Sequence, residues 1–206
     1  MIATINLLIH RIGSLVCHQS PTRTILVNNI PLPLCARCTG IYLGFLIGTL
    51  YQFILWRCHL KKLPVLKISI LSIILLIALI LESIGSYFGF WTSHQNIRLI
   101  LGLLGGSSIS LFLIPIFNFT LFIKETKQKE VGLSEWKEYI QLTLILGLIS
   151  FLITSGINKL ILYYIFAILS VFGSILLCYI IAITIIFRVH QIFYEHLTQR
   201  RDNAVR

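Results

Sequence analysis

Five long runs of apolar residues limit what this chain can fold into. They lie at residues 39–56, 65–85, 97–123, 139–157 and 160–187. Each approaches or exceeds the roughly 20 residues that an α-helix needs to cross a bilayer. Only 12% of the residues are charged, about half the fraction that is usual in soluble domains. The pattern predicts an all-α polytopic membrane protein, a bundle of about five spans forming a single membrane domain over residues 1–206.

The two ends of the chain differ from the spans. Residues 1–16 are apolar, but His10 and Arg11 interrupt them. This segment is short for a span and lacks the basic start and cleavage site of a signal peptide. We therefore expect a helix that lies at the membrane interface. Residues 188–206 keep a helical spacing of apolar side chains, which predicts a tail that continues the last helix.

The distribution of basic residues predicts the orientation of the bundle. If the five spans alternate in direction, four Lys and Arg residues lie between the first two spans, four between the third and fourth, and four after the fifth. These twelve share one side, and the other five of the 17 share the opposite side. Basic loops stay in the cytoplasm. We expect a multi-pass protein of the plasma membrane with a cytoplasmic C-terminus and with residues 17–38 outside. The net charge of +10 is then explained by basic residues that flank the spans and orient the protein in the lipid bilayer. It does not indicate a nucleic-acid partner.

A cysteine-rich loop precedes the first span. Cys17 and His18 are followed, after a short spacer, by a C-x-x-C motif at residues 35–38. Ile25–Val27 favour extended structure, and the two asparagines that follow can form a turn. We expect a short hairpin-like loop that brings the first pair back to the C-x-x-C motif at the start of a helix, where the dipole lowers the pKa of a thiol.

The first chemistry that fits this loop is a metal site. Cys17, His18, Cys35 and Cys38 form a Cys3His set, and C-x-x-C is a common half-site for tetrahedral zinc. Neighbouring residues of an extended chain point in opposite directions. Binding of one ion by both Cys17 and His18 therefore needs a special backbone conformation. The spacing favours this zinc hypothesis over the other two.

The other two chemistries are redox exchange and a purely structural role. In a quinone-linked thiol–disulfide oxidoreductase, Cys35 and Cys38 would be the exchanging pair, Cys17 the resolving partner and His18 a proton carrier. In the structural interpretation, Cys17 and Cys35 form a disulfide, or the thiols are buried and unreactive. Whether the chain is an enzyme stays open at this point.

A second group of polar residues is expected at the same end of the bundle. Glu82 lies toward the outer end of the second span, and Arg98 begins the third span, with His94 just before it. An ionisable residue inside a membrane is costly and indicates either a pair or a functional site. Glu82 and Arg98 therefore predict an ion pair, or else a polar site of a small-solute transporter that His94 joins.

The cysteine motif resembles that of a known family. The stretches that carry the resemblance are "CHQSPTRT" and "PLPLCARCTGIYLGFLIG", and "NIRLILGLLGG" resembles a later segment. They are similar to the uncharacterised prokaryotic membrane-protein family named domain of unknown function 2085, over about residues 15–106. Glu82 stands where that family tends to have an aspartate. The resemblance implies an integral membrane protein with a shared Cys/His motif, and it implies no particular activity.

Overall fold

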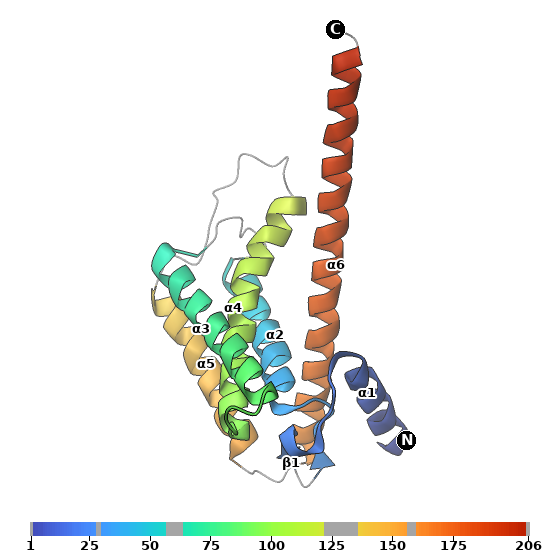
Figure 1. Ribbon diagram of the computed structural model, residues 1–206. Helices are drawn as coiled ribbons and strands as arrows, with labels where there is room; N and C mark the ends of the chain where they lie inside the picture. The colour runs from blue at the N-terminus through green and yellow to red at the C-terminus, as the bar shows by residue number, and fades with distance from the viewer. Residues whose placement is uncertain (1, 28–29, 57–63, 122–135, 156–159, 205–206) are drawn as a thin grey trace.

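A computed structural model describes residues 2–27, 30–56, 64–121, 136–155 and 160–204, and it confirms an all-α bundle (Figure 1). Within these ranges the chain forms six α-helices, a 3-10 turn η1 and one short hairpin. In chain order the elements are α1 Ile2–Val16, η1 Pro21–Arg23, β1 Leu26–Val27, β2 Ile30–Pro31, α2 Ala36–Trp56, α3 Leu66–Tyr87, α4 Gln95–Leu121, α5 Trp136–Thr154 and α6 Leu160–Ala204.

Four of the described helices are long and apolar enough to cross a membrane. They are α3, α5 and most of α4 and α6. The predicted first span corresponds to α2, which does not belong to these four. This helix carries two polar side chains, Arg37 and Gln52, which neighbouring helices cover. Gln52 is 1% exposed and donates a hydrogen bond to Ser110 on α4.

Close packing of α2 against α4 forms the centre of the bundle. A Cβ atom added to Gly40 on α2 would lie 2.5 Å from the carbonyl oxygen of Leu99. One added to Gly102 on α4 would lie 2.6 Å from the carbonyl oxygen of Arg37. The two backbones therefore touch, as small residues allow in membrane helices. The glycine stripe of α2 is a packing surface.

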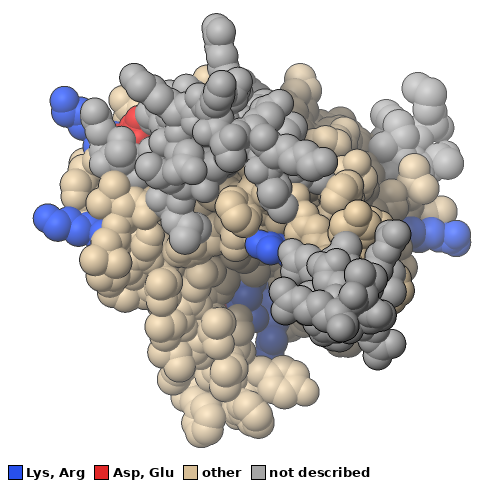
Figure 2. All heavy atoms as spheres, turned by 90° about the horizontal axis from the view of Figure 1, so that it is seen from above, with Lys and Arg blue, Asp and Glu red and all other residues tan. Residues whose placement is uncertain are grey.

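The outer face of the bundle is apolar. Four isoleucines of α3 are each about half exposed, namely Ile70, Ile73, Ile74 and Ile77. Seen from the end at which α6 terminates, the described Lys and Arg side chains in view stand apart from one another among other residues (Figure 2). A surface of this kind fits contact with lipid tails and not with water.

The helices α2 to α6 alternate in direction (Figure 1). The start of α2, the end of α3 and the start of α4 therefore share one end of the bundle, which we name the hairpin end. Beyond the opposite end, α6 continues as one helix to Ala204, as the tail pattern predicted. At the hairpin end, α1 packs against the first turns of α6, where the Tyr163 hydroxyl lies 3.5 Å from His10 Nε2.

The predicted hairpin is present next to α1. Strands β1 and β2 pair antiparallel, with Leu26 opposite Pro31 and Val27 opposite Ile30. The two asparagines of the expected turn lie outside the described residues. Val27 is buried, and so is Leu32, whose backbone N–H donates to Ile25. Burial of these apolar side chains fixes the loop against the bundle and returns the chain to the start of α2.

Candidate metal centre

Three cysteines meet at the hairpin end. The Sγ atoms of Cys17, Cys35 and Cys38 all lie within 4.8 Å of one another. Cys17 is buried, and the other two are partly buried at the N-terminus of α2. Zinc–sulfur bonds of about 2.3 Å in a tetrahedron hold two sulfurs about 3.8 Å apart. The three thiols therefore need only small movements to bind one ion.

The backbone around Cys17 is arranged to stabilise a thiolate. The N–H of Gln19 donates to Cys17 Sγ over 3.5 Å, and the N–H of Cys35 donates to the same atom over 3.3 Å. Gln19 has a φ of 50°, a left-handed conformation that is uncommon outside glycine. This conformation turns the chain back after Cys17. Backbone strain of this kind often accompanies functional sites.

The three thiols differ in acidity. The pKa of Cys17 is lowered, because the thiols of Cys35 and Cys38 donate hydrogen bonds to its sulfur, as do the two backbone N–H groups. The pKa of Cys35 is raised, chiefly because its proton is held by the Cys17 sulfur. The pKa of Cys38 is raised for the same reason, and burial adds to both shifts. Without metal, the cluster therefore holds its negative charge at Cys17.

Gln19 ties the loop to the rest of the protein, a role that the sequence analysis missed. Its side-chain Nε2 donates to the carbonyl oxygens of His10 in α1 and of Pro33 before the C-x-x-C motif, each over 2.8 Å. Gly13 makes room for this contact, since a Cβ there would lie 2.6 Å from the Pro33 oxygen. The only signal in the sequence was the position of this glutamine directly after the Cys-His pair.

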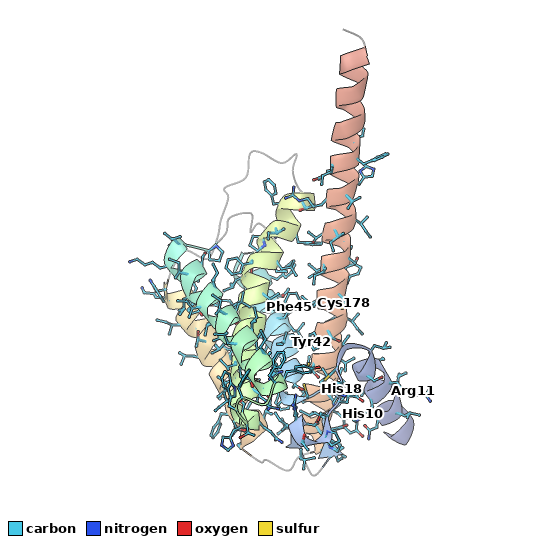
Figure 3. The ribbon with its side chains drawn as sticks, viewed as in Figure 1. His10, Arg11, His18, Tyr42, Phe45 and Cys178 are labelled. Carbon is cyan, nitrogen blue, oxygen red and sulfur yellow. The ribbon has the colours of Figure 1, made fainter. Side chains whose placement is uncertain are left out.

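His18, the fourth predicted ligand, lies beside the thiols without joining their group. It lines the same cavity as the three cysteines and stands near the start of α2 (Figure 3). The group of mutually close ligand atoms contains the three sulfurs and no ring nitrogen from the described residues. The alternation of side chains along the chain explains this separation, since His18 directly follows Cys17.

The second predicted group is built around Glu82. Arg37 Nη2 lies 2.6 Å from Glu82 Oε2, and Arg98 Nε lies 3.6 Å from Glu82 Oε1. The expected contact between Glu82 and Arg98 is therefore present, but Arg37 is the closer partner, and sequence reasoning missed it. Arg98 also donates to the Ser86 hydroxyl over 2.7 Å. His94 is exposed, and its backbone oxygen accepts from the Arg98 N–H.

Comparisons with known proteins match the region that holds these residues. The model of a family described as "Predicted membrane protein (DUF2085)" matches residues 17–112. An uncharacterized protein of Methanocaldococcus jannaschii is 33% identical over 126 residues, which cover 60% of this chain and 76% of that protein. Another of Methanothermobacter thermautotrophicus is 30% identical over 98 residues, which cover 46% of this chain and 81% of that protein. No solved structure matches the chain.

Proposed function

The chain belongs to the DUF2085 family of predicted membrane proteins, and we propose that it binds one zinc ion at the extracytoplasmic end of its bundle. Cys17, Cys35 and Cys38 supply three of the four protein ligands. The observation that supports this function is the mutual approach of their three sulfurs within 4.8 Å. That the chain is an integral membrane protein with a cysteine cluster at the hairpin end does not depend on the identity of the metal.

The chemistry of the donors fits zinc. Thiolates suit a soft or borderline metal ion, and sites that carry them bind zinc in tetrahedral geometry. Backbone N–H groups already donate to the Cys17 sulfur, which is the kind of outer contact that orients a ligand. A bound zinc would staple the loop to α2 and, with an open position, would supply a Lewis acid.

The fourth ligand in this proposal is His18. Its ring belongs to the wall of the cavity beside the thiols, so a change in side-chain conformation is the movement that the site requires. A Cys3His set closes a structural zinc site, whereas three protein ligands leave a position for water or another molecule. The variant His18→Ala separates the two possibilities. A loss of zinc affinity well beyond the roughly 10–100-fold that an outer contact costs supports ligation by His18, and an unchanged affinity leaves the fourth position open.

Bound metal in the purified protein tests the function directly. We expect about one zinc per chain by inductively coupled plasma mass spectrometry of the full chain in detergent. Cys35→Ser and Cys38→Ser should lose the metal. Cys178→Ser is the matched control, because Cys178 is an exposed thiol in the middle of α6 (Figure 3). Zinc that is absent, or that Cys178→Ser removes equally, would contradict the proposal.

The alternative function is a quinone-linked thiol–disulfide oxidoreductase. The same close approach of sulfurs favours it, since the lowered pKa of Cys17 provides a thiolate next to two thiols. In this reaction Cys35 and Cys38 form a disulfide and release two electrons and two protons, which convert a quinone to its quinol. Thiol counting before and after reduction distinguishes the functions. Two thiols that appear only on reduction, in protein free of metal, would support exchange and refute zinc.

A further inference from the structure

A small cavity opens beside the three thiols. The residues that line it carry more positive charge than the thiolates and Glu82 neutralise. The cavity has a volume of about 220 Å³. Three arginines from three different elements line it, namely Arg23 from η1, Arg37 from α2 and Arg98 from α4. The remaining lining residues are polar, thiol or apolar, and no carboxylate is among them.

Glu82 only partly neutralises these arginines. It is a single carboxylate that contacts both Arg37 and Arg98 from outside the cavity wall. The Arg98 side chain is 9% exposed, and its Nε makes no hydrogen bond in the described structure. Burial of a charged group without full pairing is costly. Arg23 adds a third positive charge. Among the described residues, its Nη2 donates only to the Ser86 carbonyl oxygen, over 3.5 Å.

Metal binding at the cysteines would not remove the excess of positive charge. Three thiolates with a divalent ion carry one formal negative charge, and Glu82 adds a second. The three arginines exceed this by one. The N-terminus of α2 also borders the cavity. Cys35 directly precedes this helix, Arg37 and Cys38 belong to its first turn, and all three line the cavity. Backbone N–H groups at a helix N-terminus favour a further negative charge.

The size of the cavity restricts the ligand. Sites for drug-sized molecules occupy about 300–1,000 Å³, so a cavity of about 220 Å³ suits a smaller group. A tetrahedral oxyanion is of suitable size and matches the forked donors of arginine, which bind phosphate in a bidentate manner. The cavity lies at the end of the bundle, where lipid headgroups and free anions are both within reach.

We propose that the cavity lined by Arg23, Arg37 and Arg98 binds a phosphate group, either as inorganic phosphate or as the headgroup of a phospholipid. The ligand sits beside the cysteine cluster, and Arg23 supplies the guanidinium that Glu82 does not engage. The proposal goes beyond the metal site and does not require it, because the arginines and their charges are in place without an ion.

Calorimetric titration of the full chain in an uncharged detergent tests this site. Two probes are used, inorganic phosphate and a short-chain phosphatidic acid, and diacylglycerol with the same chains serves as the lipid without phosphate. Saturable binding of inorganic phosphate indicates a free anion, and binding of phosphatidic acid alone indicates a lipid headgroup. Saturation by neither probe, or equal binding of diacylglycerol, would overturn the proposal.

Variants that are expected to weaken or to tighten phosphate binding identify the residues that hold the ligand. Arg23→Gln should weaken binding by about tenfold or more, since it removes hydrogen bonds to a charged ligand. Arg11→Gln is the matched control, because Arg11 is exposed on the side of α1 away from the bundle (Figure 3). Glu82→Gln should tighten binding, because it frees Arg37 and Arg98 from their carboxylate. Equal effects of Arg23→Gln and Arg11→Gln would contradict the site. Size-exclusion profiles and helical circular dichroism show that each variant is folded.

Discussion

Cys17 differs from the other two cysteines of the cluster in the direction in which its pKa is shifted. The pKa is lowered at Cys17 and raised at Cys35 and Cys38. At neutral pH the last two carry protons, which zinc must displace. Zinc binding should therefore release about two protons, and the affinity should rise about 100-fold per pH unit. Acid weakens binding because protons compete with the ion at the two thiols whose pKa is raised.

This pH dependence can be measured by calorimetry in buffers that differ in ionisation enthalpy, which counts the protons released. Competition with a chromophoric chelator at two pH values gives the affinity. Cys178→Ser should show the same proton count as the parent protein. A count near three would mean that Cys17 is also protonated without metal, and a count near zero would mean that all three residues are already thiolates.

Gln19 should control metal affinity without binding the metal. Its side chain joins α1 to the segment before the C-x-x-C motif. The variant Gln19→Leu keeps the volume and removes both hydrogen bonds. Loss of an outer contact of this kind lowers metal affinity by about 10–100-fold. We expect zinc to bind at one per chain with that weaker affinity in a chelator competition. The same change at Gln141, an exposed residue on α5, should leave the affinity unchanged, and an equal loss there would refute the role of Gln19.

The sequence predicted the three cysteines of the centre better than the contacts that position them. A C-x-x-C motif has a characteristic spacing, and the hairpin that returns it to Cys17 follows from turn and strand preferences. The pairing of Arg37 with Glu82 joins residues 45 positions apart. It depends on how α2 and α3 pack, which no local pattern encodes. Gln19 was likewise missed, because its side chain donates to carbonyl oxygens 9 and 14 positions away along the chain.

The contact between α2 and α4 makes a prediction about stability. A Cβ atom at Gly106 would lie 2.8 Å from the carbonyl carbon of Ile41, and it would lie closer still to the carbonyl oxygen of Ile41. Gly106→Ala should therefore force the helices apart and destabilise the fold by about 1–3 kcal/mol. Gly147→Ala is the control, because a Cβ there meets nothing within 4 Å. It should be neutral or stabilising by up to about 1 kcal/mol, from helix propensity alone.

Thermal unfolding of the two variants in one detergent, followed by circular dichroism at 222 nm, compares their stability. A lower unfolding temperature for Gly106→Ala alone supports close backbone packing. Equal shifts in both variants would mean that the substitution acts on the helices themselves and not on their contact.

The helices differ in how clearly the composition of each one predicts a membrane span. The α3 helix carries apolar residues on every side and lies at the edge of the bundle, so hydropathy identifies it. The α2 helix is central, and its glycines and Gln52 face other helices. Burial among helices relaxes the need for apolar side chains at these positions, where Gln52 is 1% exposed. The predicted first span, residues 39–56, lies within α2.

The orientation of the bundle decides which chemistry the cluster can perform. Twelve of the 17 basic residues should lie in the cytoplasm, with the C-terminus. In a bacterial host, a C-terminal fusion to green fluorescent protein should fluoresce, and alkaline phosphatase fused there should be inactive. Phosphatase fused after Thr92, at the hairpin end, should be active. The matched pair of phosphatase fusions controls for expression.

The opposite result would place the cysteine cluster in the cytoplasm. Thiols are kept reduced there, and stable disulfides are rare. An inactive fusion at Thr92, together with an active one at the C-terminus, would therefore exclude a structural disulfide between Cys17 and Cys35 and would leave the metal site as the better explanation of their approach. With the expected orientation, both zinc binding and exchange with a quinone stay chemically open, and the metal content of the purified protein distinguishes them.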